Sequence, residues 1–440
     1  MDATIVKTWL REQLSVAHRD YVFANAQYDL GWLRTLGVEV KGRINDVCIA
    51  DTLIDEERPE GYSLEALAQR WLGIGKEESV LRAAADNYGI NAKADLWKLP
   101  ANLVGAYGEA DPVRTLAIWQ KQKPVLHEEG LWQVYELERQ LIPILFEMFW
   151  RGIRVDTDFG QQLNDRWLKR ERELFHLLGG LDIWSTVDVA KLCDKEKIHY
   201  PRTTKGNPSI TKQFMEASSH PKLIELRELR ALQRTRSIYL EQNLLKDVIN
   251  GRIHPQYIQM ASDDGGTRTM RLSCRNPNAQ QFPKRSSLFD AKTLRHCLLP
   301  EAGSRWAKFD YWSQEPVIQC HYGLVQNLPG AEETAAAFRR GIKLATFVEK
   351  GTKGRLNYDQ AKAVILGRSY GMGAPKMRSH NEHAAQRVPV APRRVRPDRA
   401  VHCHPRQKCQ RRRLAARLHQ NSRRPQTSLQ SLATCCHLER

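Results

Sequence analysis

The sequence has no long apolar run. No stretch of about 18 consecutive apolar residues occurs, which is the length needed to cross a bilayer as a helix. The first residues, MDATIVKTWLREQ, contain no continuous apolar segment of the kind found in signal peptides. We therefore expect neither a membrane span nor a secretory leader.

Paired cysteine motifs are also missing. The chain has nine cysteines, an odd number, and no repeated CxxC spacing. The cysteines and histidines beyond residue 400 fit no standard zinc pattern. These features favour reduced thiols in a cytoplasm-like compartment and argue against a disulfide framework.

Aromatic residues are absent from the last part of the chain. Residues 379–440 contain no Phe, Trp or Tyr, and they carry thirteen Arg and one Lys against three acidic residues. This segment therefore holds +11 of the net charge of +18. A segment with so little apolar surface is expected to be disordered. The positive charge favours a polyanionic partner, because each neutralised phosphate releases counterions.

The preceding part has the length and patterning of a folded body of mixed α and β structure. Apolar periodicity predicts a helix from Ser63, a long helix ending in a turn at Gly152 and a second helix after it. Residues 219–248 read as one long helix. Arg227, Arg230 and Arg234 share one of its faces, which indicates either a solvated surface or a stripe that follows a DNA backbone.

The stretch GGTRTMRLSCRNPNAQQFPKR, residues 265–285, is too polar for a core strand. Arg271, Lys284 and Arg285 can contact phosphates, and Asn278 and Gln280 can donate hydrogen bonds to base edges or sugars. So many donors with fixed geometry favour nucleic-acid contact over an ordinary loop.

This stretch resembles the segment GTxTGRLSSxxPNLQNIPxR of the family A DNA polymerases. The agreement runs through ten positions, namely Gly266, Thr267, Arg271, Leu272, Ser273, Pro277, Asn278, Gln280, Pro283 and Arg285. Met270 replaces the usual Gly, and Ala279 the usual Leu. The resemblance implies DNA contacts by Thr267, Arg271, Asn278 and Gln280, together with Arg230 and Arg234 of the long helix, and a nucleotide contact by Arg285.

The stretch LRHCLLPEAGSRWAKFDYWSQEP, residues 294–316, looks like the palm strand and the first catalytic motif of that family, and it places Asp310 at the end of a strand. An isolated Asp310 would more often be a helix cap. The resemblance instead makes Asp310 a catalytic and metal-binding residue, and makes Glu315 the residue that excludes a ribose 2′-hydroxyl. Two Mg²⁺ ions would then assist phosphoryl transfer.

The stretch DQAKAVILGRSYGMG, residues 359–373, resembles the fingers helix RxxxKxxxFGxxYG. Lys362 and Tyr370 are eight residues apart and therefore share a helix face. The resemblance implies that Lys362 holds the incoming triphosphate, that Tyr370 packs under the templating base pair and that Gly371 leaves room for it. Tyr358 stands where the family has Arg, and Leu366 where it has an aromatic residue.

The front of the chain resembles DnaQ-like 3′–5′ exonucleases in the stretches NAQYDLGWL and YGEADPVRTL. The resemblance makes Asp29 and Asp111 metal ligands and lets Tyr107 orient the attacking water. Asn25 would support this site, and Asp46 matches a familiar acidic position of the domain.

Two carboxylate motifs are missing. The chain has no His-Asp-Glu triplet after the fingers stretch, and no Asp-x-Glu pair precedes Asn25. We therefore expect a truncated polymerase of phage or prophage type whose residues 379–440 are read out of frame. A genuine basic DNA-binding tail is the competing interpretation.

The expected architecture is α/β plus α. An RNase H-like exonuclease domain would precede an incomplete right-hand polymerase domain. The expected boundaries are an exonuclease-like domain at 1–125, a helical thumb at 126–250, a partial palm at 251–330, a fingers segment at 331–378 and the basic tail at 379–440.

The expected function is DNA-directed DNA synthesis with Mg²⁺, using primer–template DNA and deoxynucleoside triphosphates. We expect a cytoplasmic monomer, in a bacterial or phage-infected cell, that is impaired by the missing carboxylates. Two alternatives stay open. One is a catalytically dead, DNA-binding remnant, and the other is a nuclease of ribonuclease D type.

Overall fold

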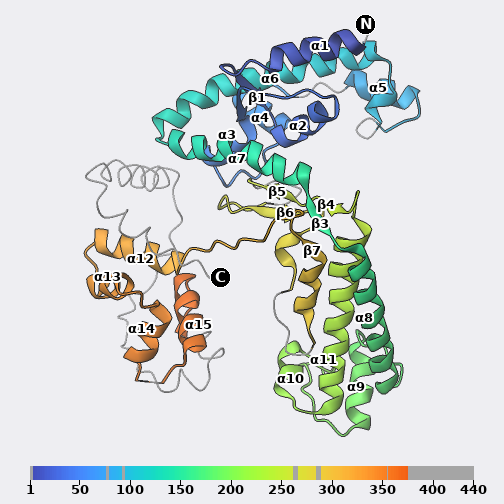
Figure 1. Cartoon of the computed structure of the whole chain (residues 1–440), viewed down its shortest axis with the longest axis vertical. Helices are drawn as coiled ribbons and strands as arrows, with labels where there is room; N and C mark the ends of the chain where they lie inside the picture. The colour runs from blue at the N-terminus through green and yellow to red at the C-terminus, as the bar shows by residue number, and fades with distance from the viewer. Residues whose placement is uncertain are drawn as a thin grey trace. The chain divides into compact units, whose positions relative to one another are not determined.

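The structure, a computed structural model, describes residues 3–75, 79–91, 95–260, 266–283, 289–353 and 355–374, without the side chains of residues 79, 80, 106 and 107. The chain divides into two compact units, Met1–Trp306 and Ala307–Arg440 (Figure 1).

The first unit begins with a helix and a parallel β-α-β element. Helix α1 (Ala3–Leu14) precedes β1 (Asp20–Phe23), α2 (Ala26–Thr35) and β2 (Arg43–Asp46). Strands β1 and β2 pair in parallel from Asp20↔Arg43 to Phe23↔Asp46, which requires the crossover that α2 supplies. Strand β2 leads directly into α3.

Helices cover this small sheet. They are α3 (Val47–Ile54), α4 (Leu64–Leu72), α5 (Ser79–Asn87), the short η1 (Leu96–Lys98), α6 (Ala101–Glu128) and α7 (Trp132–Arg151). Two of these helices begin at capping residues, since the Asp46 side chain caps α3 and the Ser63 side chain caps α4. The shared core includes Leu30, Ile49, Leu67, Ile118 and Ile142.

A second core of the same unit is mostly helical. It contains α8 (Thr157–Leu177), α9 (Thr186–Lys195), α10 (Lys212–Ala217), α11 (Pro221–Arg234) and η2 (Thr235–Lys246). Helix α8 packs along α11 and η2 (Figure 1). The helix expected over residues 219–248 is confirmed as one helical run, but η2 is a π-helix. The buried apolar residues of this run are leucines at short helical spacings, among them Leu223, Leu226 and Leu229.

Short strands connect the two cores. Strand β3 (Ile153–Val155) lies between β4 (Arg252–Ile253) and β7 (Leu298–Leu299), and both pairings are antiparallel. Gly152 forms the turn before β3 with φ +67°. A Cβ at this position would lie 2.6 Å from the Ile253 carbonyl oxygen, so only glycine fits without displacement. A separate hairpin pairs β5 (Gln256–Ile258) with β6 (Ser273–Arg275), followed by η3 (Ala279–Gln281) and η4 (Ala291–Cys297).

The described part of the second unit is four helices: α12 (Gln314–Val325), α13 (Ala331–Arg339), α14 (Leu344–Gly351) and α15 (Tyr358–Ser369). Helices α12 and α13 pack as one pair, and α14 and α15 as another. Trp312 meets Phe338 edge-on within the first pair, with 5.8 Å between ring centroids.

One expectation about the palm needs correction. Asp310 was expected at the end of a strand, but residues 306–310 belong to no strand, and the described residues offer no ladder partner for them. The boundary between the compact units, at Trp306 and Ala307, falls inside the expected palm span 251–330, whose assignment stays a prediction. Both findings have the same physical reason, since residues 301–311 are exposed and bury almost nothing.

Candidate active site and nucleic-acid surfaces

The first catalytic motif lies at the start of the second unit. Asp310 is exposed in an irregular segment, and Ser313 then takes a left-handed conformation (φ +49°) at the N-cap of α12. Glu315 lies in the first turn of this helix, where a carboxylate is stabilised by the positive end of the helix dipole. The two acidic residues are therefore held differently, one on an exposed segment and one on a helix.

The structure brings the first motif and the fingers motif together. The Tyr370 hydroxyl donates a hydrogen bond to Oε1 of Glu315 at 2.8 Å, although the two residues are 55 positions apart in the sequence. Tyr370 follows the last turn of α15, and its side chain is 68% exposed. The tyrosine hydroxyl is thus held by Glu315, while most of the residue is exposed.

Local signals at both ends determine where helix α15 begins and ends. Asn357 and Gln360 form a capping box at its start, and Gly371 follows its last turn with φ +80°. Lys362 is exposed two turns before Tyr370, and among the described residues no ion pair engages its ammonium. This leaves the lysine available to an anion.

The loop from Gly266 to Pro283 uses its polar side chains differently from the expectation. The Thr267 hydroxyl donates to the Arg271 carbonyl at 2.7 Å, and the Gln280 amide donates to the Leu272 carbonyl at 3.0 Å. Asn278 accepts from the Gln280 backbone N–H at 3.2 Å. These side chains satisfy backbone groups on either side of β6, where the strand pairing with β5 supplies no partners.

Thr267, Asn278 and Gln280 each keep further hydrogen-bonding capacity beside these bonds, such as the Asn278 amide N–H groups. Arg271 is exposed at the surface of the loop. Arg285 and Lys284 lie outside the described residues. The expected contacts of this stretch with DNA and nucleotide stay predictions.

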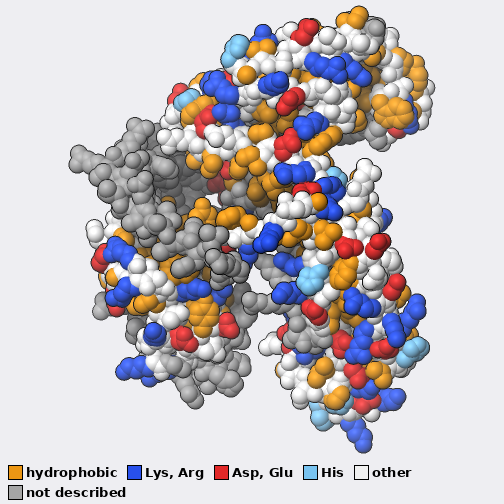
Figure 2. Space-filling view, viewed as in Figure 1, with side chains coloured by type: hydrophobic (Ala, Val, Ile, Leu, Met, Phe, Trp, Pro, Cys, Tyr) orange, Lys and Arg blue, Asp and Glu red, His pale blue; other side chains and the backbone are white. Residues whose placement is uncertain are grey.

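The basic stripe expected on the long helix does not form as a stripe. The Arg230 guanidinium donates to the Ile183 carbonyl at 2.6 Å and lies over the Trp184 ring at 5.4 Å. Burial also lowers the pKa of Arg230. Arg234 is exposed. Figure 2 shows Lys and Arg interspersed with Asp and Glu over these helices. Arg230 therefore belongs to the fold, and we withdraw it from the expected DNA contacts.

Three of the exonuclease-like residues, Asn25, Asp29 and Asp46, lie at the N-terminus of α2. Asp29 lies in the first turn of this helix, half-buried, and its pKa is raised to about 6 by burial and by the neighbouring Asp46 carboxylate. Asp46 is fully buried and accepts from the Ala26 and Cys48 backbone N–H groups at 2.7 and 2.8 Å. It thus ties the starts of α2 and α3 together. Burial raises the pKa of Asp46, and these hydrogen bonds oppose the shift.

Asp111, the second expected metal ligand, lies on helix α6. Its carboxylate is 3.5 Å from Arg114. The backbone of Tyr107 is also in α6, but its side chain is outside the described ones. Within the described residues, no group of three His, Cys, Asp or Glu side chains gathers to hold a metal. The assignment of Asp29 and Asp111 as ligands of one metal stays a prediction.

A cavity of about 360 Å³ opens beside the start of α2. It lies between the starts of α2, α3 and α4 on one side and the β5–β6 hairpin on the other. Its polar lining includes Asn25, Gln27, Gln256 and Arg275. The hairpin is fixed there by a hydrogen bond of 3.1 Å from the Gln27 amide to the Tyr257 carbonyl. The volume is within the range of small-ligand pockets.

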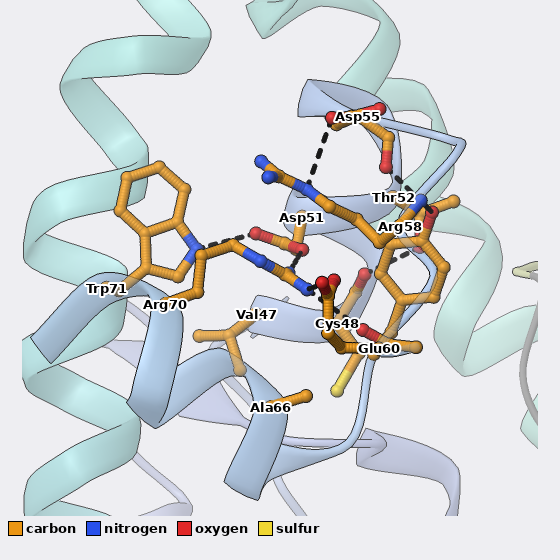
Figure 3. A network of polar contacts seen from close by, with 12 residues as sticks. Val47, Cys48, Asp51, Thr52, Asp55, Arg58, Glu60, Ala66, Arg70 and Trp71 are labelled. Carbon is orange, nitrogen blue, oxygen red and sulfur yellow. Dashed lines mark hydrogen bonds and ion pairs between the residues drawn. The ribbon is translucent and has the colours of Figure 1, made fainter. Parts of the chain in front are cut away.

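The sequence reasoning missed one buried network (Figure 3). Asp51 on α3 accepts from the Arg70 guanidinium, from the Trp71 indole at 2.6 Å and from the Gln122 amide at 3.3 Å. The available signal was an acidic residue inside the apolar run VCIADTLI, which can be buried only if it is paired. The network joins α3, α4 and α6, and it therefore supports the element that carries Asp46.

Comparisons with known proteins were consistent with this arrangement. The model of "DNA polymerase family A" matches residues 155–387. A "DNA-directed DNA polymerase" of Pseudomonas phage M6 is 35% identical over 397 residues, covering 84% of this chain and 59% of that protein. "DNA polymerase DpoZ" of Vibrio phage phiVC8 is 27% identical, covering 71% of this chain and 54% of that protein.

More distant similarity extends to cellular and solved proteins. "DNA polymerase I" of Chloroflexus aurantiacus is 26% identical and covers 80% of this chain and 38% of its own length. A solved structure described as "POL domain of Pol1 from M. smegmatis complex with DNA primer-template and dNTP" superposes with a TM-score of 0.61 at 19% identity. It covers 88% of this chain and 63% of that one.

The fold is therefore that of a polymerase domain, mixed α/β and mostly helical. The family-model match and the phage relative identify the chain more closely: it belongs to DNA polymerase family A and is of the phage type. The chain spans less than two thirds of the length of the curated relatives named above. No helix in the described ranges is both long and apolar enough to cross a membrane.

Proposed function

We propose that this chain carries the fingers and part of the palm of a template-directed DNA polymerase. The observation that carries the proposal is the 2.8 Å hydrogen bond between Tyr370 and Glu315. Two motifs that are distant in the sequence meet at this bond, as a shared nucleotide site requires. The family membership and the names of the phage relatives support the same reaction.

In this proposal each residue of the site has one physical task. The Lys362 ammonium binds the triphosphate as a point charge. The open face of Tyr370 packs against the nascent base pair, and Gly371 adds no side chain there. The Glu315 carboxylate, fixed by the tyrosine hydroxyl, occupies the space that a ribose 2′-hydroxyl would need.

The proposed cofactor is Mg²⁺, which when bound would stabilise the charge that develops on the transferred phosphoryl group. The described residues do not fit a complete two-metal site. Asp310 is a single exposed carboxylate, and Glu315 already accepts a hydrogen bond from Tyr370. Octahedral coordination needs further oxygen ligands, so we derive no step through the metal. This shortage supports the proposal that the chain is impaired by itself.

The proposed partners are primer–template DNA and deoxynucleoside triphosphates. The net charge of +18 favours phosphate contacts, and the exposed Arg271 and Arg234 are candidates for them. Thr267, Asn278, Gln280 and Arg285 stay proposed contacts of the same surface. We propose a monomer in the cytoplasm of a bacterial or phage-infected cell, which agrees with the sources of the relatives.

A primer-extension assay with Mg²⁺ and deoxynucleoside triphosphates tests the proposal. Incorporation that follows the template and is lost in Asp310→Ala would support it. The matched control is Asp359→Ala, which changes a carboxylate in the first turn of α15. Salt-sensitive DNA binding without any incorporation would contradict synthesis by this chain and favour the alternative, a catalytically dead DNA-binding remnant.

A second proposed function concerns the front of the first unit, whose exonuclease character is carried by Asp29 beside Asp46 and by the cavity at the start of α2. We propose that this region binds a single-stranded 3′ end. Degradation of single strands that survives Asp310→Ala but not Asp29→Ala would support a nuclease of this kind. Degradation that both variants retain would show a contaminating activity and contradict the proposal.

A further inference from the structure

Helices α12 and α15 are joined by two hydrogen bonds. Beside the Tyr370–Glu315 bond, the Ser369 hydroxyl donates to Oε1 of Gln319 at 3.1 Å. Glu315 and Gln319 are one helical turn apart on α12, and Ser369 and Tyr370 are neighbours at the end of α15. We call these four residues the α12–α15 clasp.

Apolar packing supports the two helix pairs but not the clasp. In the described part of the unit, the buried cluster that includes α15 draws its other members from α14 and from the segment before α15. Helix α12 instead packs on α13. The two hydrogen bonds described between α12 and α15 are directional, and such bonds tolerate little displacement.

The Ser369–Gln319 bond restrains the end of α15, from which Tyr370 reaches Glu315. Tyr370 lies beyond the last helical residue of α15, so its backbone is held by the helix on one side only. The Ser369 hydroxyl also lies 2.9 Å from the Ile365 carbonyl one turn back, and its single proton is shared between that oxygen and Gln319. The bond to Gln319 thus restrains the position of Ser369, the last residue of α15, along the axis of α12.

We propose that Gln319 and Ser369 are positioning residues, which hold the end of α15 against α12 so that Tyr370 stays in register with Glu315. The inference rests on the proposed function for the importance of Tyr370, but the contact itself is independent of activity. In a chain without this pair, the tyrosine hydroxyl would leave Glu315 for solvent much of the time.

The test uses the full-length chain with 3-fluorotyrosine at position 370. The fluorine lies next to the hydroxyl, so its ¹⁹F NMR resonance reports whether the Glu315 bond is made. Glu315→Ala gives the position of the broken bond. We expect Gln319→Ala and Ser369→Ala to move the resonance most of the way toward that position. Ser369→Thr keeps a hydroxyl and should retain the wild-type position.

The matched control is Gln326→Ala, an exposed glutamine that ends the same helix. It should leave the resonance in place. If Ser369→Ala and Gln319→Ala match the wild type while Glu315→Ala differs, the positioning role is refuted and the proposed function is untouched. If Glu315→Ala also matches the wild type, the clasp does not exist, and the observation that carries the proposed function fails with it.

Discussion

Replacement of Asp51 by alanine should strongly lower the free energy of unfolding of the front of the first unit. The Asp51 side chain is 0% exposed and Arg70 only 14%, so the variant leaves a nearly buried guanidinium without its carboxylate. Removing one partner of a buried ion pair typically costs about 3–5 kcal/mol, because the remaining charge stays desolvated. The Trp71 indole and the Gln122 amide lose an acceptor as well.

The size of the effect can be bounded within the same network. Arg70 also donates to the Gly61 carbonyl at 3.1 Å and lies 3.7 Å from Glu60, whose side chain is 65% exposed. These contacts soften the loss but do not replace a buried carboxylate. Glu60→Ala should cost at most about 1 kcal/mol, as exposed ion pairs do. It is therefore the matched control for loss of a carboxylate near Arg70.

Hydrogen exchange followed by mass spectrometry is the suitable assay, because it reports the local free energy of unfolding for peptides of α3 and α4. Asp51→Ala should lower this free energy by about 3 kcal/mol or more. The double variant Asp51→Ala with Arg70→Ala should lose less than the sum of the single variants, because no charge is left buried. An Asp51→Ala effect no larger than that of Glu60→Ala would refute the reasoning.

Three further predictions follow from other sites. Gly152→Ala should lower stability by about 3 kcal/mol in chemical denaturation, because its Cβ would meet the backbone of β4, whereas Gly179→Ala has open space and should cost about 1 kcal/mol. The folded-state pKa of Asp29 is raised from 3.8 to about 6, so the folded state binds this proton more tightly than the unfolded state does. The free energy of unfolding should therefore fall as pH rises from about 4 to 6. Asp29→Asn should remove that fall, as unfolding curves at a series of pH values would show. Arg234→Ala should weaken DNA binding and should reduce the salt slope, which is the slope of the logarithm of the binding constant against the logarithm of salt concentration, by about 1. Arg230→Ala should destabilise the helices and leave that slope unchanged. Fluorescence anisotropy at several salt concentrations measures both effects.

Local patterns predicted the helices well, because their signals lie within a few turns of sequence. The turn at Gly152 and the helical run from Pro221 to Lys246 were expected and are present. The π-helical geometry of the second half was not expected, since hydrophobic spacing does not distinguish i→i+4 from i→i+5 bonding over so short a run. The strand before Asp310 failed as a prediction, because a strand depends on partners that its own residues do not encode.

Sequence could indicate residues of the candidate site only where a motif with fixed spacing identifies them. The meeting of Glu315 and Tyr370 agrees with their assignment to neighbouring motifs of one site. The DNA contacts of the Gly266–Pro283 loop stay predictions, because a donor looks the same in sequence whether it serves a ligand or its own loop. Asp51 was missed because its partners lie 19 to 71 positions away.

DNA binding alone cannot separate a polymerase from a DNA-binding remnant. Residues 379–440 carry +11 of the net charge of +18, and counterion release makes any such chain bind DNA in a salt-dependent way. Discrimination against ribonucleotides is different, because it depends on the position of the Glu315 carboxylate. Glu315→Ala should reduce the preference for deoxynucleotides by about tenfold or more, as the loss of about 1.4 kcal/mol of discrimination would, and should leave the salt slope unchanged. Single-nucleotide insertion at a primer end, with each nucleotide type in turn, measures this ratio. An unchanged ratio in a chain that still incorporates deoxynucleotides would mean that Glu315 does not face the sugar, whatever the affinity for DNA.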